Sequence, residues 1–327
     1  MIILTGGCGF IGSATLWALN KLGRKDVLIV DNLGHSEKWR NLVSLTFRDY
    51  IHKDKFWYEL QKKKLPRFID GVLHLGACSC TTESDADYLY RNNYLYTKHL
   101  AEYCLQHGIR FIYASSGATY GKGEFGFSDD EETTRKLRPL NMYGYSKHLF
   151  DLLALEKGYF EKIVGLKFFN VYGPNEFHKG DMRSVVTKAF EQISATGKLK
   201  LFRSYRSDYP DGGQMRDFIY VKDVVKVIIF FLENPRINGL FNLGSGEART
   251  WNSLAEAVFS AMGKKTNIEY IDMPPSLEKN YQYYTEAKMD KLRQAGYREK
   301  FYSLEEGVHD YIRNYLMQDY PYLVSKS

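Results

Sequence analysis

Cysteine is scarce in this sequence, and it is not arranged for metal binding. The chain has no CxxC pair and only four cysteines among its 327 residues: Cys8, Cys78, Cys80 and Cys104. Structural zinc sites draw their ligands from such pairs. This pattern disfavours a zinc-binding module, and we expect free thiols in a reducing compartment and no bound metal.

Long apolar runs and long runs of one charge are also missing. The longest apolar stretch, around "VKVIIFFLEN", is far shorter than the ~20 residues that cross a bilayer. The opening "MIILT" has the pattern of a strand and not of a secretory signal. The net charge of +6 comes from scattered basic residues, and the run at 62–64 indicates a solvated helix face. We expect a cytoplasmic protein that binds neither membrane nor nucleic acid, and whose mild basicity suits a small anionic ligand.

Alternating strand and helix patterns fill the first half of the chain. Helices are expected near 10–22, 83–107 and 144–159, between strands at "MIILT", "DVLIVD", "GVLHLG", "RFIYASS" and "KIVGLKFFNV". Such alternation predicts an α/β fold with a doubly wound parallel sheet of the Rossmann type, whose ligands bind at the carboxyl ends of the strands. We predict a dinucleotide-binding domain at 1–168, to which 215–245 returns.

The second half has a looser pattern. A helix is expected to end near 195, and others near 222–233, 251–262, 285–294 and 303–318, with a strand at "GLFNLGS". Between them lies the loop-like stretch "SYRSDYPDGGQMRDF". We predict that 169–214 and 246–327 form mainly a smaller α/β lobe that binds the substrate.

Glycines follow the first strand in the pattern of a dinucleotide site. "TGGCGFIG" places Gly6, Gly7, Gly9 and Gly12 between the strand and the start of a helix. Small residues there allow a tight turn and a close approach of the backbone to a pyrophosphate at the positive helix end. A glycine triplet alone is weak evidence, but Asp31 ends the second strand, where a carboxylate can bind the adenosine ribose.

The form of the dinucleotide is harder to predict. Asp31 alone favours NAD, whereas Lys38, Arg40 and Lys53 follow it closely enough to neutralise a 2′-phosphate. Surface lysines are common, so these three also have an ordinary explanation. We favour NADP over NAD.

Two tyrosines and a lysine crowd the stretch "NMYGYSKHLF". On a helix Tyr143 and Lys147 are one turn apart, whereas Tyr145 faces another way. A nearby ammonium and an oxidised nicotinamide ring would both favour the phenolate. Tyr143 is therefore the candidate for chemistry, and we expect Tyr145 to pack or cap.

These motifs together resemble a known superfamily. "TGGCGFIG", "YASSGATYG", "YGYSK" and "FFNVYGP" are similar to the extended short-chain dehydrogenases/reductases, which include nucleotide-sugar epimerases and dehydratases. The resemblance implies that Tyr143 and Lys147 form the YxxxK pair and that Ser116 hydrogen-bonds the reacting oxygen. Dehydratases carry an acidic pair after this hydroxyl, but here Gly117 and Ala118 follow, which favours oxidation without loss of water.

A second acid/base group is suggested by "FNVYGPNEFHKGDMRSV". Lys179 lies in this loop between the two predicted lobes, and burial could lower its pKa enough for proton transfer. A lysine in a loop is more often simply solvated. An epimerase that returns hydride to the opposite face of a ketone would gain from such a group.

The whole set of motifs resembles the ADP-L-glycero-D-manno-heptose 6-epimerase family, whose product serves the lipopolysaccharide inner core. The resemblance implies hydride transfer from C6 to tightly held NADP⁺, a 6-keto intermediate that turns, and return of the hydride, with Tyr143 and Lys179 as acid/base groups. It implies cofactor contacts from Gly6, Gly9, Phe10, Ile11, Gly12, Asp31, Asn32, Lys38, Lys53, Leu75, Gly76, Ala77, Cys78, Ser79, Asn92, Tyr143, Lys147, Val171 and Lys179. It implies substrate contacts from Ser116, Asn170, Asp181, Lys188, Phe202, Arg203, Ser204, Tyr205, Arg216 and Tyr281.

The substrate side departs from that family in places. Asp181 and Lys188 replace an expected small hydroxyl residue and a histidine, "RSYR" differs from the family pattern, and "DYPDGGQM" is long. Arg216 could pair with a carboxylate instead of a diphosphate, and Tyr281 could be a core residue. The alternatives are another nucleotide-sugar oxidoreductase, such as a 4-epimerase with one base, and a silent cofactor sensor on the same fold. The resemblance also implies a homo-oligomer, a pentamer.

Overall fold

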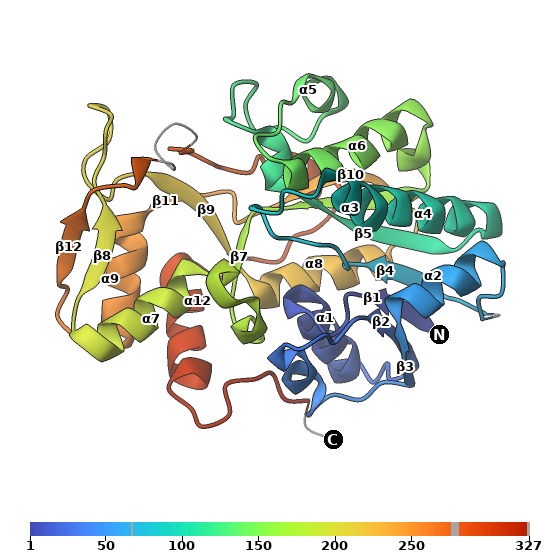
Figure 1. Ribbon diagram of the computed structural model, residues 1–327, viewed down its shortest axis with the longest axis horizontal. Helices are drawn as coiled ribbons and strands as arrows, with labels where there is room; N and C mark the ends of the chain where they lie inside the picture. Colours follow the sequence, from blue (N-terminus) through green and yellow to red (C-terminus); the bar gives the residue numbers. More distant parts are fainter. Residues whose placement is uncertain (67, 276–280, 326–327) are drawn as a thin grey trace.

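A seven-stranded parallel sheet dominates the computed structural model, which describes residues 1–66, 68–275 and 281–325 (Figure 1). The strand order is β10–β6–β5–β4–β1–β2–β3, and every neighbouring pair is parallel. The strands are β1 (Ile2–Thr5), β2 (Val27–Asp31), β3 (Asp49–His52), β4 (Gly71–His74), β5 (Arg110–Ser116), β6 (Ile163–Phe168) and β10 (Gly239–Leu243). The predicted doubly wound fold is confirmed, although the short strand β3 was not expected.

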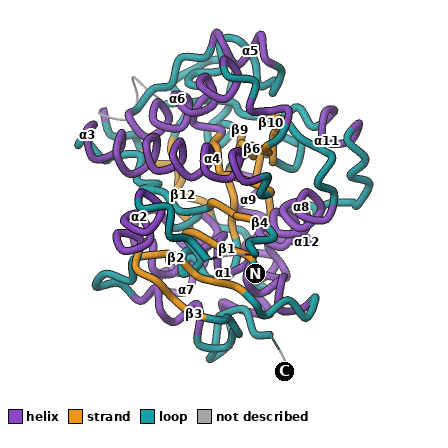
Figure 2. The backbone as a smooth tube through the Cα atoms, turned by 90° about the vertical axis from the view of Figure 1, so that its right-hand side faces the viewer, coloured by secondary structure: helices purple, strands orange, loops and turns teal. Residues whose placement is uncertain are grey.

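Helices cover both faces of this sheet, as Figure 2 shows. One face carries α1 (Phe10–Lys21) and α8 (Val221–Glu233), whose apolar side chains pack on those of β1, β2 and β4. The other face carries α2 (Lys53–Gln61), α4 (Tyr96–His107) and α6 (Met142–Glu156). Because both faces are covered, the central strands are buried throughout and are apolar without alternation up to their last residues, Thr5, Asp31 and His74. The strand order reverses between β1 and β4, where such sheets open a crevice for ligands.

A smaller lobe lies on the left of Figure 1. Its three-stranded sheet has the order β11–β9–β7, and its two-stranded sheet pairs β12 with β8. The strands are β7 (Asn170–Tyr172), β8 (Leu199–Phe202), β9 (Met215–Tyr220), β11 (Ala248–Thr250) and β12 (Ile268–Ile271). They pack with α7 (Val185–Thr196), α9 (Trp251–Ala261) and α12 (Leu304–Tyr311) around a second apolar core, to which α1 and α8 also contribute. Within the segment 215–245, β10 is a strand of the large sheet and α8 packs on that sheet, whereas β9 pairs with β7 and β11 of the smaller lobe.

Three predicted helices differ from the structure. Residues 83–107 form α3 (Ala86–Leu89), a π-helical segment (Tyr90–Leu95) and α4, and residues 303–318 form α12 followed by a second π-helical segment (Ile312–Leu316). Of residues 285–294 only α11 (Asp290–Gln294) is helical, because the Thr285 and Ala287 amides bond to Met215 and Asp217 instead. In the described part of the chain, a further short α-helix is α5 (Glu131–Lys136). No helix in the described residues is long and apolar enough to cross a membrane.

Candidate active site

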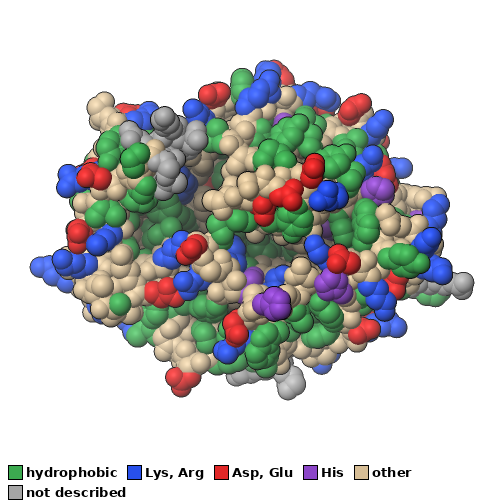
Figure 3. Space-filling model, viewed as in Figure 1, with side chains coloured by type: hydrophobic (Ala, Val, Ile, Leu, Met, Phe, Trp, Pro, Cys, Tyr) green, Lys and Arg blue, Asp and Glu red, His purple; other side chains and the backbone are tan. Residues whose placement is uncertain are grey.

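A cleft of about 480 Å³ lies at the carboxyl ends of the large sheet's strands, beside the loop that leads into the smaller lobe. Its surroundings are seen in Figure 3, where the molecule is hollowed near the middle of this face. Every residue predicted for catalysis or cofactor binding lines this cleft, except Asn32, Lys53 and Asn92. Those three line an adjoining cavity of about 190 Å³. Segments that are far apart in the sequence therefore meet in one continuous site.

The floor of the cleft is made of glycines that admit no side chain. Gly6 has a φ of 70°, and a Cβ there would lie 2.6 Å from Gly76. A Cβ on Gly12 would lie 2.0 Å from the Gly6 carbonyl oxygen. Helix α1 begins at Phe10 and has neither a side-chain cap nor an acidic residue in its first turn. Its first amides therefore face the cleft as donors for an anion, and this cradle fits the pyrophosphate of a dinucleotide.

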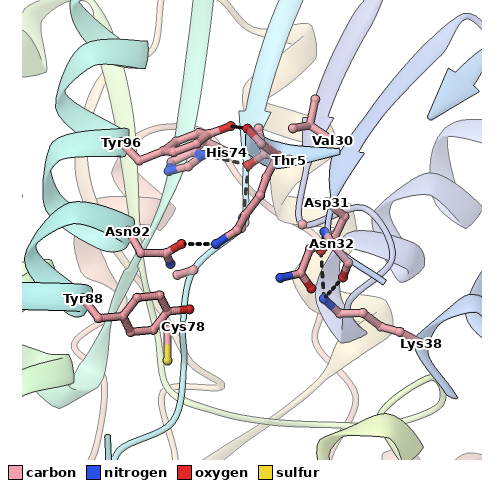
Figure 4. A pocket seen from close by; sticks show the side chains of 14 residues that line it. Thr5, Val30, Asp31, Asn32, Lys38, His74, Cys78, Tyr88, Asn92 and Tyr96 are labelled. Atoms are coloured by element: carbon pink, nitrogen blue, oxygen red, sulfur yellow. Dashed lines mark hydrogen bonds and ion pairs between the residues drawn. The ribbon is translucent and has the colours of Figure 1, made fainter. Parts of the chain in front are cut away.

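The carboxylate that ends β2 is already enclosed by donors. Asp31 accepts hydrogen bonds from the Cys8 amide at 2.8 Å and the Asn32 amide at 2.7 Å. Lys38 Nζ lies 2.8 Å from Asp31 Oδ1 and also bonds the Asn32 carbonyl at 3.0 Å, as Figure 4 shows. Lys38 neutralises Asp31, so an approaching anion meets a paired carboxylate and not a free negative charge.

The adjoining cavity adds a second cation and several aromatic rings. Lys53 Nζ donates to Asn92 Oδ1 at 2.7 Å and lies 5.7 Å from the centre of the Tyr88 ring. Tyr88 and Asn92 point into the same cavity in Figure 4, on the side opposite Lys38. The cavity is therefore flanked by two lysines and walled by aromatic surface, a combination that suits an adenosine with a phosphate.

A buried histidine beneath this cavity escaped the sequence analysis. His74 bonds the Thr5 hydroxyl at 2.7 Å and the Thr97 hydroxyl at 2.8 Å. Thr97 donates to the Asn93 carbonyl, so its oxygen accepts from His74 Nε2, and Nδ1 is left to accept from Thr5. Burial lowers the pKa of His74 to about 3, which keeps it neutral. His74 therefore supports the floor of the site, and its role depends on contacts that a sequence does not show.

Helix α6 presents Tyr143 and Lys147 to the cleft. Asn141 caps the helix by accepting from the Gly144 amide at 2.8 Å, which fixes the turn that carries Tyr143. Burial raises the pKa of Tyr143, and the neighbouring Ser116 side chain offsets part of that rise. The protein's own groups therefore favour the phenol, because burial outweighs the polar neighbours, and the effect of an oxidised nicotinamide ring on this pKa stays a prediction. Tyr145 is 45% exposed and does not line the cleft.

Lys147 is buried below Tyr143. Among the described residues its Nζ has no hydrogen-bond partner. Burial lowers its pKa to about 8, and the carboxylate of Asp151, one turn further along α6, opposes that effect. An unpartnered ammonium aimed at the cleft is suited to bind a hydroxyl of a ligand.

Lys179 enters the cleft from the loop between the lobes. It lies in the 3₁₀ turn Phe177–Met182, and its Nζ is 5.4 Å from the centre of the Phe10 ring. Burial lowers its pKa from the ordinary value, and Glu176 opposes that effect. The neighbouring His178 also lines the cleft and bonds Asn41 at 3.2 Å. Neither His178 nor Asn41 carries a sequence signal of its own.

On the substrate side, Arg216 lies between two aromatic rings. Its guanidinium is 5.3 Å from the centre of the Tyr281 ring and 5.7 Å from that of Trp251, and the two rings are joined by a 3.0 Å hydrogen bond from Trp251 Nε1 to Tyr281 OH. Phe202 packs edge-on against Tyr281. No carboxylate forms an ion pair with Arg216 in the described part of the chain, so it remains available to an anion. Trp251 was not predicted.

Among the residues predicted for the substrate, Ser116 lines the cleft, whereas the others, Phe202, Arg216 and Tyr281 included, lie outside both cavities. Asn170 donates to the Asp217 carbonyl, and the exposed Lys188 donates to the Asp181 carbonyl at 2.5 Å. The 203–205 segment bonds its own loop and the chain near 272 and 283, as shown by the contacts of Arg203, Ser204 and Tyr205. Their placement at the site stays a prediction. No cluster of metal-binding side chains occurs in residues 1–66, 68–275 and 281–325.

Known proteins share this sequence and fold. The NAD dependent epimerase/dehydratase family matches residues 2–244. An ADP-L-glycero-D-manno-heptose-6-epimerase of Nitratidesulfovibrio vulgaris is 57% identical over 99% of this chain and 100% of its own length. The solved Helicobacter pylori enzyme of the same name is 27% identical, with a TM-score of 0.81 over 96% of this chain and 95% of its own. A Thermus thermophilus UDP-glucose 4-epimerase, solved with NAD, is 27% identical, with a TM-score of 0.72 over 94% and 96% of the two chains. The chain is therefore a nicotinamide-dependent isomerase that belongs to the NAD dependent epimerase/dehydratase family, among the ADP-L-glycero-D-manno-heptose-6-epimerases.

Proposed function

We propose that this enzyme converts ADP-D-glycero-β-D-manno-heptose to ADP-L-glycero-β-D-manno-heptose by inverting C6 with two acid/base residues. The product would serve the inner core of lipopolysaccharide. The observation that carries the proposal is the meeting of Tyr143 from α6 and Lys179 from the interlobe loop in one cleft, beside the glycine floor. Two groups that can move protons, reached from different elements, suit a reaction that must work on both faces of one carbon.

The roles of the residues follow from their positions. When bound, NADP⁺ would supply the group that takes the hydride from C6 and gives it back. Ser116 holds the C6 oxygen by a hydrogen bond, while Tyr143 and Lys179 exchange its proton, one acting in each half of the reaction. Lys147 binds a ribose hydroxyl with its unpartnered ammonium and increases the acidity of the Tyr143 phenol. Gly117 and Ala118 offer no acidic group to expel a hydroxyl as water, so the sugar would keep all its hydroxyl groups.

The nucleotide end of the substrate would lie against the smaller lobe. Arg216 binds the diphosphate, since its planar fork matches two phosphate oxygens and its burial between Tyr281 and Trp251 fixes its direction. The departures at Asp181, Lys188 and "RSYR" are on this side. They would adjust how the ADP and heptose are held without changing the reaction at C6.

We infer NADP as the cofactor from the two lysines that flank the adenosine cavity. In Lys38→Ala and Lys53→Ala enzymes, the Kd for NADP⁺ is expected to rise about tenfold or more, because each loses a charge-assisted contact to the 2′-phosphate. The Kd for NAD⁺ should change less than threefold. Titration of the cofactor-free enzyme by calorimetry measures both constants.

The matched control for this prediction is Lys55→Ala, an exposed lysine two residues beyond Lys53 on α2. Its Kd for either dinucleotide should equal that of the wild type. Equal losses for NADP⁺ and NAD⁺ in the Lys38 and Lys53 variants would contradict a 2′-phosphate contact and favour NAD.

The proposed reaction is tested by NMR of ADP-D-glycero-β-D-manno-heptose incubated with the enzyme as purified, without added cofactor, and with UDP-galactose as the control. Inversion at C6 of the heptose alone supports the substrate, the reaction and a retained cofactor together. No turnover of the heptose, even with NADP⁺ supplied, would overturn the proposal.

The place and assembly of the enzyme are also inferred. We propose a cytoplasmic homo-oligomer, a pentamer as its resemblance implies. All four cysteines are free thiols, which suits a reducing compartment. Sedimentation of the purified protein measures the number of copies.

A further inference from the structure

Glu176 is a fully buried acid in the loop that carries Lys179. Its carbonyl oxygen accepts a 3.0 Å hydrogen bond from the Lys179 amide, so the turn that presents Lys179 to the cleft begins at Glu176. The turn is broken at Gly180, whose φ of 53° and ψ of −124° lie outside the helical region. The direction of Lys179 therefore depends on how the start of this turn is held.

The Glu176 carboxylate holds that start by four hydrogen bonds. The Ser184 amide donates to Oε2 at 2.6 Å, and the hydroxyls of Ser184, Thr187 and Tyr311 bond Oε1 at 2.6, 2.7 and 3.1 Å. Ser184 caps α7, Thr187 lies in its first turn, and Tyr311 ends α12. The loop is thus anchored to two helices of the smaller lobe through a single side chain.

The residue next to Glu176 anchors the same loop without a charge. Asn175 donates to Ser13 Oγ at 3.0 Å and accepts from the Leu323 amide at 2.9 Å. No lysine, arginine or histidine forms an ion pair with Glu176 in the described part of the chain, where Arg183 pairs with Glu191 instead. An unpaired buried carboxylate is costly, so its charge calls for a reason beyond packing.

The nearby partner for that charge is Lys179. Among the described residues Lys179 Nζ makes no hydrogen bond to the protein, and its environment is the Phe10 ring and the cleft. Burial favours the neutral amine, and the Glu176 carboxylate opposes it. The two effects have opposite signs and act on the group that enters the site.

We propose that Glu176 is a positioning residue for the reaction, whose carboxylate both fixes the Lys179 loop and keeps Lys179 able to hold a proton. This inference rests on the proposed role of Lys179 as an acid/base group. When C6 is inverted through a ketone, one acid/base side chain removes the proton of the C6 hydroxyl, and the other donates a proton to the hydroxyl that forms again. Lys179 must therefore start protonated in one direction of the epimerisation and start neutral in the reverse direction. Burial favours the neutral form of Lys179, and the Glu176 carboxylate acts against it.

Among the other titratable groups of the cleft, Asp31, Lys38 and His178 are balanced or neutral. Asp31 and Lys38 neutralise one another at 2.8 Å. Burial, with Lys38 and Lys179 contributing, lowers the pKa of His178 to about 4 and keeps it uncharged. The remaining groups along the cleft and the turn are Cys78, Cys80, Tyr143, Lys147, Asp181 and Arg183. Glu176, in contrast to these groups, raises the pKa of Lys179.

The experiment removes the charge and keeps the shape. In Glu176→Gln, the amide oxygen can accept from the Ser184 amide, while the amide nitrogen donates to hydroxyls of Ser184, Thr187 and Tyr311 that rotate to accept. The pKa of Lys179 is measured by competitive acetylation with acetic anhydride across pH, read by mass spectrometry. It should fall by about one unit, the size of shift that an opposite charge nearby causes.

Activity should follow in a way that a structural role would not produce. In the reaction direction in which Lys179 gives up its proton, kcat falls as the pH rises. In Glu176→Gln this fall should occur at lower pH, by the same amount as the pKa of Lys179 decreases. KM should stay within twofold. The matched control is Tyr311→Phe, which removes one hydrogen bond to Oε1 and keeps the charge, and its Lys179 pKa should equal that of the wild type.

The outcomes separate the two roles. An unchanged Lys179 pKa in Glu176→Gln, or equal shifts in Glu176→Gln and Tyr311→Phe, would overturn the proposal. If Glu176→Gln fails to fold, Glu176→Asp decides: it keeps the charge, so the Lys179 pKa should hold, and a fall of a full unit would overturn the proposal. Acetylation does not require turnover, so a shifted pKa in an enzyme that does not epimerise the heptose would refute the proposed reaction and not the coupling of Glu176 to Lys179.

Discussion

A Lys179→Met enzyme is expected to lose about 10²- to 10⁴-fold in kcat for the inversion of ADP-heptose, measured by NMR of the two C6 epimers. Methionine matches the length and apolar stem of lysine, so the contact with the Phe10 ring is kept while the proton-carrying group is lost. The loss should fall on kcat with little change in KM, because Lys179 acts on the reacting oxygen and not on the nucleotide.

Single-turnover measurements make this prediction sharper. With Tyr143 as the remaining acid/base group, one of the two C6 epimers can still give up its hydroxyl proton. That epimer should still reduce the bound cofactor, which is measured by absorbance, and the other epimer should not. Lys198→Met, an exposed lysine of the smaller lobe that pairs with Glu269, is the control and should match the wild type. Activity that survives largely intact in Lys179→Met would refute the two-base reaction and favour a single-base epimerase in which the intermediate rotates.

The sequence predicted those parts of the site that depend on local geometry. The glycines after β1 need only their own turn and the start of α1, and Tyr143 and Lys147 need only the period of one helix. For such motifs the distance along the chain determines the distance in space. The predicted strands of the large sheet were found for the same reason, since apolar runs covered by helices on both faces have a strong pattern. The stretch "KIVGLKFFNV" is the exception, because it divides into β6 and β7, which belong to different sheets.

What the sequence could not show depends on contacts between distant segments. His74 is neutral because Thr5 and Thr97 enclose it, and Trp251 matters because Arg216 reaches it from another strand. The expected continuous helix at 83–107 widens into a π-helical segment where Asn93 bonds Cys78 and Ser146 instead of solvent. In the sequence Glu176 cannot be told from an ordinary loop glutamate, because its hydrogen bonds come from the distant elements α7 and α12.

A Tyr143→Phe enzyme is expected to lose about 10²- to 10⁴-fold in kcat, because the phenol carries the proton that the other half of the reaction requires. Burial raises the pKa of Tyr143, and the side chain of Ser116 is the neighbour that counteracts this rise. Phenylalanine fills the same space and leaves α6 and its Asn141 cap intact. The free energy of unfolding should therefore change by less than about 1 kcal/mol, measured by urea denaturation.

The control is built into the same stretch of chain. Tyr145 lies two residues further along α6, is 45% exposed and does not line the cleft, so Tyr145→Phe should keep wild-type kcat and KM. If Tyr145→Phe lost activity and Tyr143→Phe did not, the assignment of the phenol from helical period would be wrong. If both variants kept activity, proton transfer at C6 would need no phenol at all. In that case Lys179 would have to serve both halves of the reaction, taking the proton before the 6-keto intermediate turns and returning it afterwards.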